Sequence, residues 1–219
     1  AGRLGDMYGK AFQGSPDGQI IYSSTGVPAP LEPVTKKWGN AFADWKGSIM
    51  NEFSLYRFKL SVLLDGQYGG DIYSQTNHKN NTLGKTRVTL PGRDGGIVGQ
   101  GVVTQGDGIF VPNTVNVPAS AYYDNYYQIS NAETNIFDAS FLKIREVRVE
   151  YTVPKSIIGK LGLQQASIAI FGRDLFNFTD FPGFDPEGGN LNNGTLTPGV
   201  ELTQFPSTRT LGANVMLKF

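Results

Sequence analysis

The sequence predicts an all-β protein whose long strands belong to the wall of a transmembrane β-barrel. Three observations carry this prediction. Several long segments alternate strictly between apolar and polar residues, a period of two that indicates strands with two different surroundings. Very short and very long connections alternate between these segments, as in outer-membrane barrels. Finally, 12% aromatic residues together with 28 Gly and 12 Pro are typical of strands separated by turns.

The composition also limits the classes of function. The 19 basic and 19 acidic residues balance, so we predict no nucleic-acid partner. No apolar run approaches the roughly 20 residues that a membrane-spanning helix needs. The chain has no cysteine, which excludes disulfides and thiolate metal sites. Its first residues have neither the basic nor the apolar region of a signal peptide, and we therefore expect the tail of a longer outer-membrane protein.

The first 70 residues are predicted to contain a loop region followed by a hairpin. Residues 1–44 contain recurrent Gly and Pro residues and show no sustained hydrophobic periodicity. We therefore expect a loop there, with one short strand at 19–23. The first long strand is predicted at 47–56, although its apolar face is interrupted by Asn51. A tight turn then leads into a cleanly two-faced strand at 58–70, and strands joined so closely form a hairpin.

The middle of the chain is predicted to be a long loop followed by two more strands. Residues 71–135 are polar and rich in turn-forming residues, and a loop of this length argues against a compact soluble domain. The third strand is expected at 138–153 and the fourth at 166–177. The short connection between them, at 154–165, starts with a proline and has room for about one helical turn.

The last strand is predicted at 208–219, after a second long loop at 178–205. Its alternate positions are apolar up to the final ring, as expected of a strand that meets lipid on one face. If the short turns are periplasmic, four aromatic rings should lie at one membrane level as an interfacial girdle. These rings are Tyr56, Phe58, Tyr151 and Phe219.

Charged residues alternate along the third strand. Glu146, Arg148 and Glu150 place two carboxylates beside an arginine, but we favour a ladder of ion pairs facing a polar lumen over a catalytic site. Lys143 and Arg145 fall on the opposite, outward parity. A lipid-facing Lys or Arg at the midplane costs about 2–4 kcal/mol, so we expect this part of the strand to rise above the bilayer.

Few residues are candidates for chemistry or binding. His78 is the single histidine, and without a second ligand nearby we expect a solvated loop residue, no metal, no cofactor and no enzymatic activity. A tyrosine-rich cluster is the best candidate for contact with a ligand, because aromatic faces suit sugar rings and peptide side chains. The alternative is that these rings pack the loop onto its neighbours or onto a partner. The cluster comprises Tyr122, Tyr123, Asp124, Tyr126 and Tyr127.

Five segments stand in order along the chain: TLPGR at 89–93, DASFLKIREVRVEYTVP at 138–154, IFGRDLF at 170–176, DPE at 185–187 and FPSTRTLG at 205–212. Together they resemble the SusC/RagA family of TonB-dependent outer-membrane transporters. Asp174 departs from the resemblance, since the family usually has Asn there, and at a strand end we expect little consequence. The terminal ring of Phe219, with the alternating apolar residues Val215 and Leu217 before it, also resembles the signal read by the barrel-assembly machinery. Tyr151 is expected at the same membrane level as this terminal ring.

The resemblance implies a 22-stranded barrel with an N-terminal plug, of which residues 1–219 would supply the last five antiparallel strands. Residues 1–44 would then be extracellular loop and residues 45–219 the strands with their long extracellular loops, and the plug would lie outside this chain. The implied function is import of an oligosaccharide or peptide across the outer membrane of a Gram-negative, Bacteroidota-like bacterium. The implied partners are a SusD-like surface lipoprotein and the TonB complex, which acts through the missing N-terminal part. An outer-membrane β-barrel enzyme and a secreted β-sandwich adhesin remain as alternatives.

Overall fold

A computed structural model of the protein describes residues 2–28, 31–187, 190–192, 195–205 and 207–219, and parts of the expected loops, at 29–30, 188–189 and 193–194, lie outside them. The chain is mostly β-strand with few helices, and no helix among the described residues is long and apolar enough to cross a membrane. It divides into two compact units. The sheet unit comprises Ala43–Gly69, Ala139–Pro186 and Phe205–Phe219, and the loop unit comprises Ala1–Phe42, Gly70–Asp138 and Glu187–Gln204.

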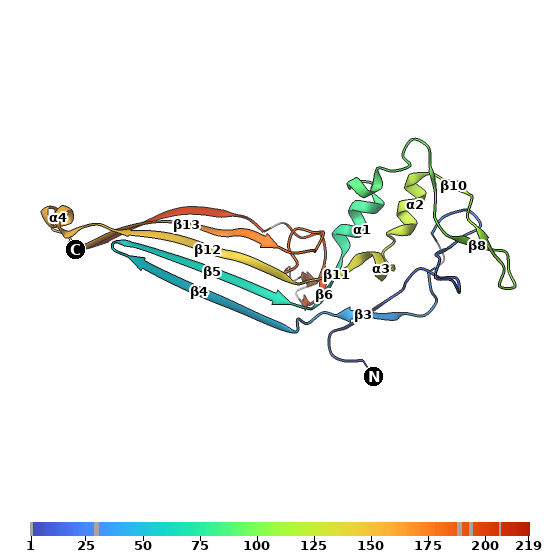
Figure 1. The fold of residues 1–219 in the computed structure, drawn as a ribbon, viewed down its shortest axis with the longest axis horizontal. Coiled ribbons are helices and arrows are strands. Elements are labelled where there is room, and N and C mark those ends of the chain that lie inside the picture. The colour runs from blue at the N-terminus through green and yellow to red at the C-terminus, as the bar shows by residue number, and fades with distance from the viewer. Residues whose placement is uncertain (1, 29–30, 188–189, 193–194, 206) are drawn as a thin grey trace. The chain divides into compact units, whose positions relative to one another are not determined.

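The sheet unit is built on five long strands that run side by side (Figure 1), in the order β17-β13-β12-β5-β4. Every neighbouring pair is antiparallel. The five strands are the segments in which the sequence alternates, and a two-residue turn containing Tyr56 at a φ of 53° closes the β4–β5 hairpin. The elements are β4 (Trp45–Leu55), β5 (Phe58–Tyr68), β12 (Phe141–Thr152), α4 (Lys155–Ile158), η2 (Gly159–Leu161), β13 (Gln165–Phe178) and β17 (Thr210–Lys218).

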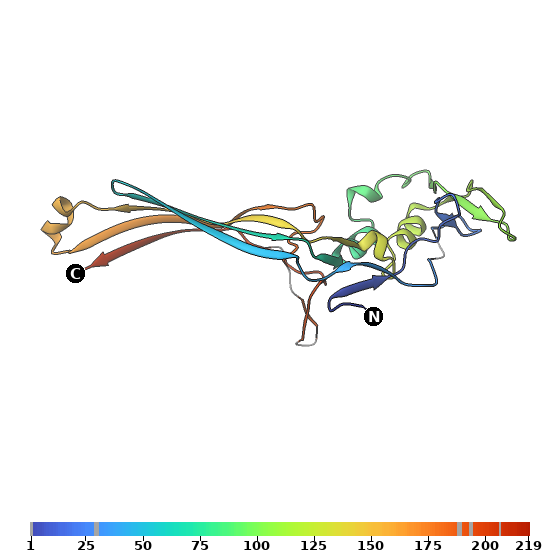
Figure 2. The same ribbon diagram turned by 60° about the horizontal axis from the view of Figure 1, so that its bottom comes forward.

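The two faces of this sheet have opposite chemistry, and exposure is inverted relative to a water-soluble protein. Seen from a second direction the strands form one thin, twisted layer (Figure 2). Ile170 on the apolar face is 63% exposed, whereas Ala169, the next residue on the other face, is 1% exposed. The apolar face presents a continuous exposed surface of large side chains. They include Ile49, Phe53, Leu55, Phe58, Leu60, Leu142, Ile168, Ile170, Phe176, Leu211, Val215 and Leu217.

A β-bulge at Arg145 reverses the alternation within β12. Ile144 is opposite Leu64 and Glu146 is opposite Leu63, so Arg145 has no partner position on β5. Because one extra residue moves every preceding side chain to the other face, Lys143 lies opposite Asp65, on the same face as Glu146. The prediction that Lys143 and Arg145 point outward is therefore wrong. Lys143 is 3% exposed, and the Arg145 guanidinium is tied to the carboxylate of Asp65.

The matching irregularity on β13 is centred on Asp174, which lies inside the strand rather than at its end as expected. Between Arg173 and Phe176 the strand holds one residue more than the facing part of β12, and Asp174 adopts a φ of 49°. Asp and Asn tolerate this left-handed conformation better than other residues that carry a side chain. The conformation thus accounts for an Asp at a position where the similar family has Asn.

The loop unit contains short strands, three α-helices and one 3-10 helix where residues 71–135 were expected to form one long loop, so that expectation is wrong. The helices were missed because they are short and polar, without an apolar stripe. Figure 1 shows α1, α2 and α3 close together. The elements are β1 (Asp6–Gly9), β2 (Ile21–Tyr22), β3 (Lys36–Asn40), β6 (Asp71–Ser74), α1 (Gln75–Thr82), η1 (Arg87–Thr89), β7 (Ile97–Val98), β8 (Val102–Thr104), β9 (Phe110–Pro112), β10 (Asn116–Val117), α2 (Ala119–Tyr126), α3 (Ala132–Asn135), β11 (Ile136–Asp138), β14 (Asn190–Asn192), β15 (Thr195–Thr197) and β16 (Val200–Glu201).

Buried amide side chains help to hold the loop unit together beside its buried apolar residues. Asn135, fully buried, donates from Nδ2 to the carbonyl oxygens of Asn131 at 2.9 Å and Gln128 at 3.2 Å. His78 lies in α1 with 8% exposure, and its Nδ1 is 2.6 Å from the Tyr127 carbonyl oxygen, so Nδ1 carries the proton. The prediction of a solvated His78 is therefore wrong, since its ring joins α1 to the segment after α2.

Glu201 of β16 fixes the start of α1. Its carboxylate accepts hydrogen bonds from the Ser74 hydroxyl at 2.7 Å, the Thr76 hydroxyl at 2.5 Å and the Gln204 amide at 3.0 Å. Burial alone would raise the pKa of Glu201, but these hydrogen bonds outweigh it and lower that pKa. A buried carboxylate at the first turn of a helix also complements the helix dipole.

Candidate functional site

The predicted tyrosine cluster lies on α2, where most of its rings are packed against one another. Tyr122 stacks on Tyr126 at 5.7 Å between ring centroids, and its hydroxyl is 3.3 Å from that of Tyr22 on β2. Tyr126 in turn packs against Phe12 at 4.8 Å. Burial raises the pKa of Tyr122 and Tyr126, so both phenols are neutral at physiological pH. These contacts support the packing alternative for both rings.

The other members of the cluster differ in their surroundings. Tyr127 stacks on Tyr123 at 6.4 Å, and Asp124 is exposed on the same helix. Tyr123 is the member that lines a cavity in the loop unit, and its hydroxyl donates to the Pro91 carbonyl oxygen at 3.3 Å. A candidate for ligand contact is therefore Tyr123 together with the residues around this cavity.

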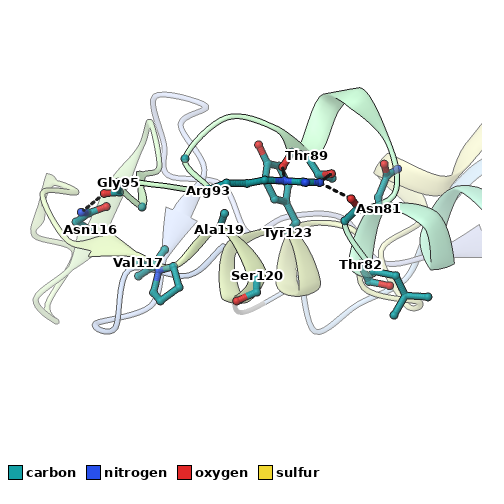
Figure 3. Close-up of a pocket in the computed structure, with 15 residues that line it drawn as sticks. Asn81, Thr82, Thr89, Arg93, Gly95, Asn116, Val117, Ala119, Ser120 and Tyr123 are labelled. Carbon is teal, nitrogen blue, oxygen red and sulfur yellow. Dashed lines mark hydrogen bonds between the residues drawn. The ribbon is translucent and has the colours of Figure 1, made fainter.

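The cavity has a volume of about 650 Å³, within the range of small-molecule sites. It lies between the segment after α1, the turn after η1 and the first turn of α2. Figure 3 shows Arg93 extended between Thr89 and Tyr123, with Asn116 bonded to Gly95 at the far side. The cavity is lined by Asn81, Thr82, Leu83, Gly84, Thr89, Gly92, Arg93, Gly95, Gly96, Asn116, Val117, Pro118, Ala119, Ser120 and Tyr123.

Arg93 is the charged side chain of this lining, and neutral groups hold it in place. Its Nε donates to the Thr89 carbonyl oxygen at 3.0 Å, and its Nη2 donates to the Gly84 carbonyl oxygen and, at 3.3 Å, to the Thr89 hydroxyl. No ion pair of Arg93 occurs within the part of the chain that the structure describes. The guanidinium is thus oriented without being neutralised.

Sequence reasoning missed Arg93, although a signal for it was present. The TLPGR segment at 89–93 was noticed for its resemblance to the family, and in the structure it forms one wall of the cavity. Asn116 and Ser120 could not have been found in this way, because they lie far from Arg93 in sequence and no motif marks them.

The predicted charged ladder lies on the polar face of the sheet unit. Arg173 Nε donates to Glu146 Oε2 across the β12–β13 pair at 2.7 Å. Arg148 Nη2 donates to Glu150 Oε2 along the same strand at 2.9 Å. A further cross-strand pair joins Lys59 to Glu52 at 2.8 Å. Each of these carboxylates thus has a basic partner on the same face of the sheet.

A second group of charges surrounds the β12 bulge. Arg145 Nη2 is 2.7 Å from Asp65 Oδ2, and Arg145 Nη1 is 3.3 Å from Asp174 Oδ1. Lys143 Nζ is 2.6 Å from Oδ1 of Asp185, in the segment that follows β13. The Asp of the DPE segment therefore fixes its loop to the polar face through a nearly buried lysine.

The predicted girdle residues lie on the apolar face or continue it. Phe58 and Tyr151 are opposite each other, with ring centroids 4.9 Å apart, and the same cross-strand row continues through Ile168 to Val215. Leu217 is opposite Ala166 near the end of β17. Phe219 follows β17 and is 80% exposed. No group of three or more metal-binding side chains occurs among the described residues.

Comparison with known proteins gives a consistent picture. No family model matches the sequence. The chain is 28% identical over 205 residues to TonB-dependent receptor P39 of Formosa agariphila, a match that covers 90% of this chain and 19% of the receptor. It is 31% identical over 88 residues to TonB-dependent receptor P3 of the same organism, covering 38% and 9%. The chain thus spans about a fifth or less of the length of these relatives.

The fold is shared with a solved importer. The structure of the RagAB peptide importer in the closed-closed state matches 100% of this chain and 23% of its own with a TM-score of 0.63 and 17% identity. The open-open state of the same importer matches equally completely, with a TM-score of 0.62. These relatives are receptors and importers rather than enzymes. Sequence and fold together support a likeness of this chain to part of a SusC/RagA-type TonB-dependent receptor.

Proposed function

We propose that the chain forms barrel wall and extracellular loops of an outer-membrane importer that depends on TonB. The inverted exposure of the sheet carries this proposal. A sheet in water buries its apolar face, whereas here Ile170 and Val215 are exposed and Ser61, Ser167 and Ala169 on the polar face are buried. Lipid is the surrounding in which an exposed apolar face and a paired, charged opposite face are both favourable.

The sheet would be completed by strands outside this chain. Five strands are too few to close a barrel. In lipid, the free edges of β4 and β17 would leave backbone groups unsatisfied at several kcal/mol each. We therefore propose that both edges pair with the rest of a 22-stranded barrel, of which these are the last five strands, and that a plug supplied from elsewhere fills the lumen.

The lengths of the connections support an orientation. The β4–β5 turn and the α4–η2 connection are short, as periplasmic turns are, and both lie at the end of the sheet where β17 ends (Figure 1). The segments of the loop unit are assigned to the extracellular side. Tyr151, Val215, Leu217 and Phe219 would then belong to the periplasmic girdle and the assembly signal.

The solute would bind at the extracellular loops and enter the lumen after the TonB complex acts on the plug. A SusD-like lipoprotein is the proposed outer partner, since the matched solved structure is of RagAB, an importer of peptides. The proposed solute is an oligosaccharide or a peptide, and the proposed location is the outer membrane of a Gram-negative bacterium. Tyr123 and its cavity are the proposed contact of this chain with the solute.

Uptake by cells that carry the whole receptor tests the proposal. Labelled peptides and oligosaccharides are supplied to cells with the receptor, to cells without it, and to cells in which TonB is inactivated. Uptake of one solute class should require both the receptor and TonB, and the receptor should fractionate with outer membranes. Recovery of the receptor in the soluble fraction, or uptake unchanged by loss of TonB, would contradict the proposal.

A further inference from the structure

The loop cavity has an electrostatic character that selects for one class of ligand. Its lining contains one arginine and neither aspartate nor glutamate. Burial raises the pKa of Tyr123, the other ionisable group of the lining, so its phenol is neutral and does not repel an anion. A ligand that enters therefore meets a single positive charge among neutral hydrogen-bonding groups.

The Arg93 guanidinium has donors left for a ligand. Arginine carries five N–H groups, and the hydrogen bonds to Thr89 and Gly84 engage Nε and Nη2. The two N–H groups of Nη1 make no hydrogen bond within the described residues. Arg93 is exposed, and its hydrogen bonds already orient its side chain. Little side-chain entropy is therefore lost when a ligand pairs with it.

We propose that this cavity binds the carboxylate of an acidic ligand, with the Arg93 guanidinium as its ion-pair partner. One positive charge with a free Nη1 matches one carboxylate, whereas a polyanion would leave most of its charge unbalanced. Ser120 and Asn116 line the same cavity and offer neutral polar contacts, while the Tyr123 ring offers an apolar face for the rest of the ligand. The volume of about 650 Å³ admits a short peptide or two to three sugar rings.

The inference rests on the proposed import function for its biological meaning, but the site can be tested by binding alone. Two sources can supply the carboxylate: the C-terminus of a peptide or a uronic acid residue of a saccharide. Purified full-length receptor is titrated with triglycine and its C-terminal amide, and with trigalacturonate and maltotriose. The expected result is that one carboxylate-bearing probe binds at least about tenfold more tightly than its neutral counterpart.

Three variants assign the effect to the cavity. R93Q should weaken binding of the acidic probe about tenfold to a hundredfold, and R93K, which keeps the charge, should recover part of that loss. S120D leaves the hydrogen bonds of Arg93 in place and adds a competing carboxylate at the first turn of α2, so it should weaken binding similarly even if R93Q folds poorly. R87Q, which removes an exposed charge outside the lining, should change binding less than twofold.

The outcomes separate this inference from the proposed function. Equal binding of acidic and neutral probes, or acidic binding unchanged in both R93Q and S120D, would overturn the carboxylate site while TonB-dependent uptake of a neutral solute still held. Carboxylate binding that is lost in these variants, in a receptor without any TonB-dependent uptake, would support the site and refute the import function.

Discussion

A lysine placed on the apolar face at the middle of β17 should destabilise the receptor far more than the same lysine one residue away. Ala213 lies near the middle of β17 and opposite Ile170, in the cross-strand row that continues through Val149 to Leu60. The next residue, Asn214, points to the polar face. Comparing A213K with N214K therefore changes the face while keeping the strand, the depth and the introduced charge nearly constant.

The expected magnitude follows from the position along β17. A lipid-facing lysine costs about 2–4 kcal/mol at the midplane and about 0–1 kcal/mol near the interfaces. Leu217 is four residues further along, about 13 Å at 3.3 Å per residue, or about 10 Å of depth for a strand tilted by about 40°. Half of an apolar band about 25 Å tall is about 12 Å, so L217K lies near the interface. A213K should lower the folding equilibrium constant about 30- to 700-fold, and L217K much less.

The assay is urea unfolding of the full-length receptor in lipid vesicles, followed by the shift of the folded band in unheated gel samples. N214K should stay within about 0.5 kcal/mol of the unchanged receptor, because a lysine facing a polar lumen remains hydrated. Equal losses in A213K and N214K, or a larger loss in N214K, would refute the assignment of the faces.

Further predictions concern four single positions. E201Q should destabilise the loop unit by about 1–3 kcal/mol, seen as faster hydrogen exchange of the α1 amides at pH 7. Since the pKa of Glu201 is lowered in the folded protein, its stabilisation is fully present above the unfolded pKa and is lost as the pH falls through the lower folded pKa, so the difference between the variant and the native protein should shrink on acidification. D174N should keep the stability of the sheet within about 0.5 kcal/mol, whereas D174A should lose about 1–2 kcal/mol in urea unfolding because alanine fits a φ of 49° poorly; equal losses would contradict a role for the backbone conformation. N135A should lower the thermal midpoint through a loss of about 1–3 kcal/mol, because it removes a fully buried amide that donates to the carbonyl oxygens of Asn131 and Gln128; an unchanged midpoint would argue against a stabilising role of buried amides in this unit. Deletion of Phe219 from the full-length receptor should reduce the folded barrel in outer-membrane fractions more than the uptake per folded molecule, and a normal folded yield with lost uptake would place this residue in the transport path instead.

The loop unit is the part of the fold that sequence reasoning described least well. Helices α1 and α2 have polar sequences without an apolar stripe, so periodicity could not distinguish them from loop. Their stability comes from contacts between distant segments, such as His78 with Tyr127 and Glu201 with Thr76. The cavity next to Arg93 arises from the same packing, and for that reason only one of the predicted tyrosines, Tyr123, lines it.

The sequence by itself determined the five long strands and the chemistry of their two faces, because a side-chain period of two is a local property that survives without knowledge of the neighbours. The tertiary structure decided the face on which Lys143 lies, since the bulge at Arg145 forms through pairing with β5 and β13; in the sequence it shows only as a shift of the apolar positions from Leu142 and Ile144 to Val147 and Val149. The tertiary structure also decided that Asp174 bends a strand and that Asp185 holds a loop by pairing with Lys143. Local alternation follows from the covalent chain, whereas register and ion pairs depend on residues that the chain brings together only when it folds.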